Sequence, residues 1–252
     1  MDIGGLQRVA GSAEDLVREA QRLHGSGRLS EAIAAYQRAL LQMPEHADSW
    51  FNLGLLFRQA RRPDEALVCY QKALNLGIAA PEAVHVNRAV IFADYLHQYE
   101  EAERELRNAL QLRPGFIPAL LNLANIQEDR GRRNEALELY RTVLALDPRC
   151  SLALARFANM QSPADGNAQL IAQLQAALAR PDLTDADQAL LGFALGRALD
   201  ATDAYDEAFS AYTVANAAVR ANAARAGQRY DRRAQEQFID RLIRNGSAVA
   251  AP

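Results

Sequence analysis

The stretch Trp50-Phe51-Asn52-Leu53-Gly54 decides the fold, because it opens a pattern that the chain repeats about every 34 residues. The pattern continues with Glu65-Ala66-Leu67, Tyr70 and Ala73-Leu74. A second copy reads Leu120-Leu121-Asn122-Leu123-Ala124, followed by Gly131, Glu135-Ala136-Leu137, Tyr140, Val143-Leu144 and Pro148. Internal repeats of this period indicate a solenoid, whose stacked units expose a long concave surface. The sequence therefore predicts a repeat array that holds another molecule.

The copies predict six units of two helices each. Apolar residues fall at i, i+3, i+4 and i+7 in each half, which is typical of a helix with one buried face. The units cover about 13–46, 47–80, 83–116, 117–150, an irregular 151–188, and 189–222. Pro81-Glu82 is an insertion before the third unit. In the irregular unit we expect a shortened helix pair, with Thr184 as an N-cap.

Small and large residues recur at fixed positions of the repeats, and these positions predict how the helices pack. A small residue recurs where two helices must approach closely, and a large residue follows it that would fill the space between neighbouring pairs. The small residues are Gly54 and Gly196 with Ala32, Ala66, Ala102, Ala136 and Ala208, and the large ones are Tyr36, Tyr70, Leu106, Tyr140 and Tyr212. Proline cannot continue a helix, so Pro44, Pro114 and Pro148 predict where second helices end.

The segments outside the array predict an N-terminal tail at 1–12, a capping helix at 223–244 and a flexible tail at 245–252. From Ala218 to Pro252 the chain has seven arginines against three acidic residues. These arginines could touch nucleic acid or an acidic surface. The simpler interpretation is a terminal cap with its arginines in water, because an apolar stripe runs along the same helix at Ala234, Phe238, Ile239 and Leu242.

Composition excludes several classes of protein. The net charge of the 252-residue chain is −3, so the chain as a whole lacks the excess positive charge that is typical of nucleic-acid-binding proteins. Cys69 and Cys150 lie in different units, so they indicate neither a disulfide framework nor a metal site, and we expect a reducing, cytoplasmic location. Met1 to Gly11 has no signal-peptide pattern, and no apolar run reaches the roughly 18 residues of a membrane span.

Residues that carry chemistry are scarce, so we expect no enzyme, no cofactor and no metal. His24, His46, His85 and His97 share no metal-ligand spacing. No nucleophile elbow and no phosphate-binding Gly-x-x-x-x-Gly-Lys-Ser/Thr loop is present. The basic turn Arg130-Gly131-Arg132-Arg133 is interpreted as a solvated loop.

The repeated positions resemble the tetratricopeptide repeat (TPR). The resemblance covers Ala13 to about Asn222, with a departure from Gln161 to Asp187, and it rests on several fixed positions that recur in five units. It implies an all-α, right-handed superhelix of about six antiparallel helix pairs. First helices would line the concave face and second helices the convex face.

The resemblance also implies which residues face the concave groove. These are Phe51, Asn52, Leu55, Asn87, Arg88, Ile91, Leu121, Asn122, Asn125, Arg156 and Asn159. Asparagine offers both a donor and an acceptor, so a row of asparagines can bind a peptide backbone without reading its sequence, and arginine adds charge-assisted bonds. A structural role for Asn52 and Asn122 between repeats is the alternative. A clamp for a C-terminal carboxylate is matched only in part, by Asn87, Asn122 and Arg156.

The predicted function is a non-catalytic scaffold that holds an extended peptide or helix of a protein partner. A narrower resemblance gives the first alternative. Ala189 to Asp200, Tyr205 to Phe209, Ala215-Asn216 and Tyr230 to Leu242 resemble the segment that joins TPR units to a sulfotransferase domain in bacterial two-part proteins. The array would then recognise substrate for a catalytic domain that this sequence does not include. Self-association of the array is the second alternative.

Overall fold

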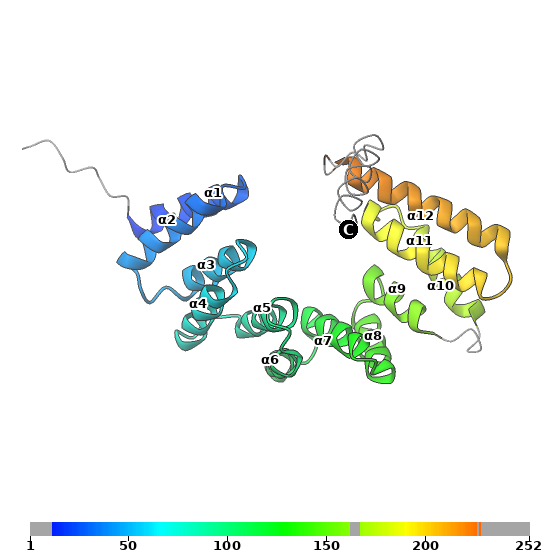
Figure 1. Cartoon of the computed structure of the whole chain (residues 1–252), viewed down its shortest axis with the longest axis horizontal. Coiled ribbons are helices and arrows are strands. Elements are labelled where there is room, and N and C mark those ends of the chain that lie inside the picture. The colour runs from blue at the N-terminus through cyan, green and yellow to red at the C-terminus, as the bar shows by residue number, and fades with distance from the viewer. Residues whose placement is uncertain (1–11, 162–166, 226, 228–252) are drawn as a thin grey trace, which may run out of the picture. The chain divides into compact units, whose positions relative to one another are not determined.

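The computed structural model describes residues 12–161, 167–225 and 227. Every regular element in these ranges is an α-helix, as predicted. The chain divides into two compact units, Met1–Pro148 and Arg149–Pro252, whose helices are labelled in Figure 1.

The first of these compact units, called the first unit below, is a stack of four helix pairs, each of which corresponds to one repeat. In each pair the first helix packs closely against the second helix that follows it. Each second helix also contacts the first helix of the next pair. The pairs are α1 (Ala13–Gly25) with α2 (Leu29–Gln42), α3 (Ala47–Gln59) with α4 (Pro63–Asn75), α5 (Pro81–Asp94) with α6 (Tyr99–Leu112), and α7 (Ile117–Asp129) with α8 (Arg133–Leu146). The connections within each pair are short enough to require antiparallel neighbours.

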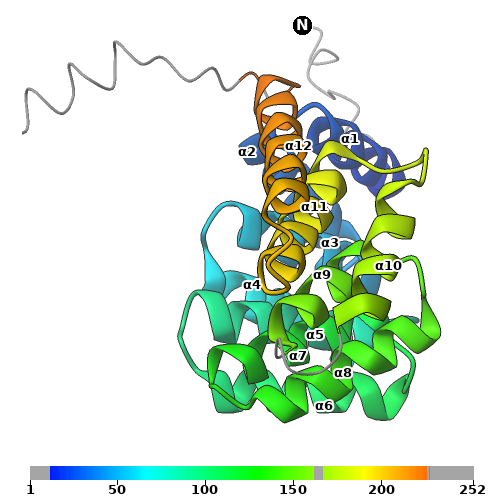
Figure 2. The same ribbon diagram turned by 90° about the vertical axis from the view of Figure 1, so that its right-hand side faces the viewer.

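First helices lie on the inner side of this stack. Helix α5 contacts both α3 and α7, whereas successive second helices touch one another less. Helices that are closer to their counterparts lie on the inside of a curve, and Figures 1 and 2 show the same arrangement within this unit. The predicted placement of first helices on the concave face is therefore confirmed for α3, α5 and α7.

The predicted helix ends and close approaches are also present. Pro44, Pro114 and Pro148 each lie two residues beyond the last residue of α2, α6 and α8. A Cβ atom on Gly54 would lie 2.5 Å from Cε1 of the buried Tyr70 ring. The large residue thus fills a space inside its own pair, opposite the small residue. Gly196 and Tyr212 repeat this arrangement, also at 2.5 Å.

The third pair departs from the predicted register by one residue. Helix α5 begins at Pro81, inside the predicted insertion, because proline is well suited to the first helical position. Its buried residues Val84, Ala89 and Ile91 match Ser49, Gly54 and Leu56 of α3 at a spacing of 35 residues. The remaining extra residue falls in the turn before α6, where His97 has a φ of 53°. Every side chain of α5 is therefore turned by one position from the predicted alignment.

The second unit contains an irregular arrangement followed by a regular pair. Helices α9 (Ser151–Met160) and α10 (Asn167–Leu178) have 10 and 12 residues, so the predicted shortening is confirmed. Both pack mainly against α11 (Asp185–Asp200) and hardly against each other. Thr184 caps α11 as predicted, and its side chain accepts a hydrogen bond from the Asp187 amide at 3.1 Å.

Helix α12 (Tyr205–Arg225) closes the described part of this unit against α11. Apart from Ser12, which caps α1, the predicted tails at 1–12 and 245–252 lie outside the described residues, as does most of the predicted capping helix at 223–244. None of the described helices has both the length and the apolar character needed to cross a bilayer.

Candidate protein-binding site

Three asparagines hold the same structural position on the inner helices of the first unit. Asn52 on α3, Asn87 on α5 and Asn122 on α7 are spaced by 35 residues, and each is half-buried. The Nδ2 atom of Asn87 donates to the Ala83 carbonyl oxygen at 2.8 Å. Asn122 makes the equivalent bond to Pro118, also at 2.8 Å. These three side chains are called the asparagine ladder below.

The bonds to the helix backbone define what the ladder can offer to a ligand. Each uses one of the two N–H groups of the amide, and a bond to the same helix holds the amide plane in place. The Oδ1 acceptor and the second N–H of Asn87 and Asn122 remain for another molecule, because an asparagine amide has two donors and an acceptor with two lone pairs. A fixed amide also loses less side-chain entropy when it binds.

Apolar and polar side chains flank the ladder on the same helices. Phe51, Leu55 and Leu121 are half-buried, and the Phe51 ring lies 5.8 Å from the ring of Tyr70, measured between centroids. The Asn125 side chain is fixed by Tyr140, because the Asn125 Oδ1 accepts a hydrogen bond from the Tyr140 hydroxyl at 2.8 Å. These side chains keep part of their surface open beside the asparagines.

Arg88 and Ile91 do not belong to this surface, which corrects the sequence prediction. Ile91 has no exposed surface. The side chain of Arg88 is 15% exposed and pairs with Glu105 at 2.9 Å. The reason is the one-residue shift of α5, which puts Arg88 where α3 has Leu53 and brings Asn87 into the ladder.

The two predicted groove residues beyond the first unit lie on α9. Arg156 is exposed, and Asn159 is half-buried with its main-chain oxygen accepting a hydrogen bond from Arg197 at 3.3 Å. Both belong to the second unit. The ladder that the structure defines therefore consists of the three asparagines of the first unit.

Comparison with known proteins identifies the repeat. Two models of the tetratricopeptide repeat match residues 17–83 and 96–156, which together are about half of the chain. The chain belongs to the tetratricopeptide-repeat family. The TPR fold is also that of pilF from Pseudomonas aeruginosa, with a TM-score of 0.64, 19% identity, and coverage of 79% of this chain and 88% of that chain.

Other relatives support the same assignment. A TPR protein from Parabacteroides merdae has a TM-score of 0.59 at 18% identity, with 90% of this chain and 83% of that chain covered. Cellulose synthase 1 operon protein C of Komagataeibacter xylinus is 34% identical over 187 residues, which are 69% of this chain and 13% of that protein. Mitochondrial import receptor subunit TOM70 of Rattus norvegicus is 27% identical over 146 residues, covering 54% and 24%.

The chain thus spans 13% and 24% of the length of these two relatives. What it shares with them is the repeat array. TPR arrays are scaffolds for interaction with other proteins through extended surfaces. The TPR fold of this chain suggests a scaffold of this kind.

The TPR units also contain a buried ionic cluster that the sequence did not reveal. Glu105 on α6 is almost fully buried, and it accepts a hydrogen bond from Nδ1 of His85 at 2.7 Å. Arg88 pairs with its other oxygen and also donates to Gln71 at 3.0 Å. A signal was present in the repeat alignment, because Glu105 takes the place that Cys69 and Leu139 hold in the neighbouring units. A carboxylate in a column of apolar residues indicates a buried partner.

Glu103 organises a second cluster, which corrects the interpretation of the basic turn. Arg130 and Arg132 do not both extend into water, because each donates to Oε1 of the buried Glu103, at 3.0 and 3.1 Å. Arg132 also donates to Gln127 at 3.0 Å, and Arg107 donates to the other Glu103 oxygen at 2.6 Å. The turn between α7 and α8 therefore ties the fourth TPR unit to the third.

The Glu105 cluster should make stability depend on pH. Burial alone would raise the pKa of Glu105, but the hydrogen bonds from His85 and Arg88 outweigh it and hold the pKa below its ordinary value. A lowered pKa contributes stability above the unfolded-state pKa of about 4.3, and this stability is lost as pH falls through the folded-state pKa. We expect Glu105→Gln to melt lower than wild type at pH 7, by a margin that shrinks below about pH 4. Thermal melts followed by circular dichroism at pH 7, 4 and 3 measure this margin. An unchanging margin would contradict the proposed linkage, and Glu138→Gln, at an exposed site, is the control.

Proposed function

We propose that the inner face of the first unit binds an extended segment of a protein partner through the asparagine ladder. The observation that carries the proposal is the repetition of one side chain at one structural position in three successive TPR units: Asn52, Asn87 and Asn122. Asn87 reaches this position only because α5 is shifted by one residue. The asparagine is thus present in three successive TPR repeats, although α5 is shifted by one residue. This repetition suits a ligand that contacts each of these repeats in the same way.

An extended peptide backbone has the matching chemistry. Each of its residues offers one N–H donor and one carbonyl acceptor, and an asparagine amide can pair with both. Packed helices lie about 10 Å apart, while an extended chain rises about 3.3 Å per residue. One asparagine would therefore meet about every third residue of the segment. Phe51, Leu55 and Leu121 would contact apolar side chains in between.

The curated relatives support a protein ligand, because an import receptor subunit is among them. The contacts inside the first unit support an extended ligand in particular. Two of the ladder amides, those of Asn87 and Asn122, are oriented by their own helices, so they present the same groups at successive steps along the face. Sequence-independent backbone contacts would supply affinity, and the apolar neighbours would supply preference for particular side chains.

Peptides selected on the protein itself provide the test. A displayed library of random peptides is panned against the full chain, and the dissociation constants of the enriched peptides are measured by fluorescence anisotropy. We expect the triple variant Asn52→Ala/Asn87→Ala/Asn122→Ala to bind about a hundredfold more weakly, since three hydrogen bonds of about 1 kcal/mol each are lost. Its melting temperature should not fall, because alanine is the better helix former.

The matched control is Asn134→Ala, which removes an exposed asparagine from α8. This variant should bind the selected peptides like wild type. If the triple variant binds within twofold of wild type, the ladder is not the binding site. The amides would then serve only their own helices.

A further inference from the structure

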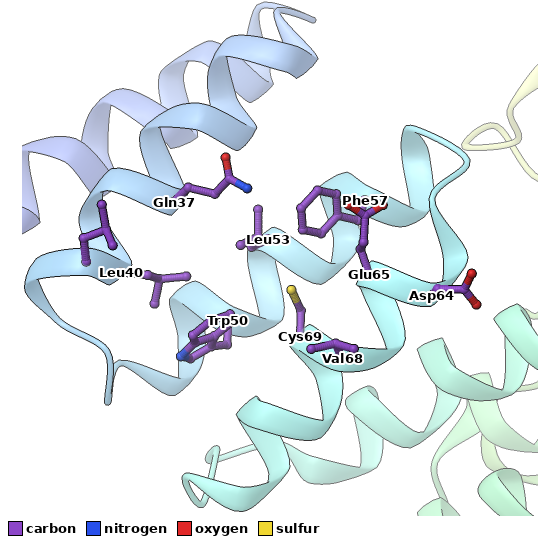
Figure 3. Close-up of a pocket in the computed structure, with 10 residues that line it drawn as sticks. Gln37, Leu40, Trp50, Leu53, Phe57, Asp64, Glu65, Val68 and Cys69 are labelled. Atoms are coloured by element: carbon purple, nitrogen blue, oxygen red, sulfur yellow. The ribbon is translucent and has the colours of Figure 1, made fainter.

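A trough on the outer side of the first unit lies between α2, α3 and α4 and has a volume of about 630 Å³. Figure 3 shows its lining, which includes Leu53 and Phe57 from α3 and Val68 and Cys69 from α4. The trough is separate from the ladder, because residues 50, 53 and 57 and residues 51, 52 and 55 lie on opposite faces of α3. It therefore forms a second surface, independent of the proposed peptide site.

The rim of the trough is apolar at two positions where the next two second helices are polar. Leu41 is 83% exposed and Val68 is 59% exposed. The residues matched to Leu41 in the next two second helices are Asn75 and Gln111, and those matched to Val68 are Arg104 and Glu138. All four matched residues are also exposed. The TPR fold does not require apolar residues at these positions, so Leu41 and Val68 have a local reason to be there.

The floor of the trough is also more apolar than the matching site of the next repeat. Leu53 and Cys69 match Arg88 and Glu105 of the next unit. In that unit the pair forms an ion pair at 2.9 Å, which fills the corresponding space with charge. Leu53 and Cys69 cannot form such a pair. Their side chains therefore present only carbon and sulfur to the floor of the trough.

An apolar trough selects the conformation of its ligand. An extended peptide would bury backbone N–H and carbonyl groups against a floor that cannot bond them, at a large cost in free energy. An α-helix satisfies these groups internally and can present apolar side chains alone. The lining of α3 at Trp50, Leu53 and Phe57 follows helical spacing and is about two turns long. We propose that this trough binds an amphipathic α-helix of a protein partner, with apolar residues at i, i+3, i+4 and i+7.

Charge at one end of the trough gives the helix a direction. Asp64 and Glu65 lie at the first turn of α4 and line this end. Glu65 is already paired with Arg62, whereas Asp64 is exposed. A lysine or arginine flanking the apolar stripe of the bound helix would pair with Asp64. A partner helix with one basic residue at the end beside the first turn of α4 would match Asp64, while Glu65 keeps its pair with Arg62.

The test uses a designed peptide as the probe. A fluorescein-labelled, end-blocked peptide of about 16 residues has leucines at i, i+3, i+4 and i+7 and lysines elsewhere on an alanine background. A second peptide has the same composition with the leucine stripe scrambled. Both are titrated against the full chain by fluorescence anisotropy. We expect the helical peptide to bind at least tenfold more tightly than the scrambled one.

The variant that tests the site exchanges the rim for its sister residues. Leu41→Asn/Val68→Arg copies Asn75 and Arg104, so it should fold like wild type and lose at least tenfold in affinity for the helical peptide. The triple ladder variant should bind this peptide unchanged, which separates the two sites. Equal binding of the scrambled peptide, or of the rim variant, overturns the proposal. Light scattering that shows a wild-type dimer and a monomeric rim variant would instead assign the trough to a second copy of the chain.

Discussion

Replacing Tyr70 with alanine is expected to lower the free energy of unfolding of the first unit by about 4 kcal/mol, the usual range for a fully buried aromatic side chain. Tyr70 has no exposed surface. Its ring lies against Gly54, where a Cβ atom would be 2.5 Å away, and 5.8 Å from the Phe51 ring. The cavity would form beside Gly54, where α3 approaches α4 closely and no side chain of the glycine can fill it.

Chemical denaturation followed by circular dichroism measures this loss as a change in the free energy of unfolding. Tyr205→Ala is the matched control, because Tyr205 is 61% exposed. It should change stability by less than about 0.5 kcal/mol. A Tyr70→Ala variant as stable as this control would show that α3 and α4 do not meet as the structure describes.

Removing the Glu103 carboxylate should have the second largest effect. Glu103→Ala leaves Arg130 and Arg132 without the acceptor that they share, and breaking a buried ion pair by removing one partner costs about 3 kcal/mol or more. Because side chains of Arg130 and Arg132 are 26% and 36% exposed, water compensates part of the loss. We expect a decrease of about 2 kcal/mol in the free energy of unfolding.

The control for Glu103 is Glu138→Ala, which breaks an exposed pair with Arg141. Exposed pairs contribute at most about 1 kcal/mol. Urea denaturation of both variants gives the comparison. If the two lose equal stability, the turn between α7 and α8 does not tie the fourth TPR unit to the third through Glu103.

The repeat pattern predicted most of the fold, because each unit solves the same packing problem with similar residues. Gly54 and Gly196 identified the close approaches, Pro44, Pro114 and Pro148 the helix ends, and Thr184 the start of α11. These signals are local, and local chemistry is visible in one sequence. The resemblance to arrays linked to sulfotransferases rests on residues up to 242, many of them outside the described ranges, and it stays a prediction.

The errors at the site come from one residue of register. Pro81-Glu82 adds two residues, and the sequence does not say how many enter α5 and how many enter a turn. Both alignments keep Ala102 and Leu106 in place, so the pattern of the second helix does not choose between them. The buried positions Val84, Ala89 and Ile91 decide for a shift of one residue. That shift removes Arg88 and Ile91 from the inner face and completes the ladder with Asn87.

The most direct test of the ladder asks whether it binds the backbone of its ligand. A library-selected peptide is resynthesised with single N-methyl groups at successive amides, each of which removes one backbone donor. Dissociation constants are measured for methylated and unmethylated peptide with wild type and with Asn122→Ala, as a double-mutant cycle. We predict that one methylation weakens binding to wild type about fivefold or more and leaves binding to Asn122→Ala unchanged. Methylation effects of equal size in wild type and variant, at every position of the peptide, would contradict backbone recognition by the asparagine ladder.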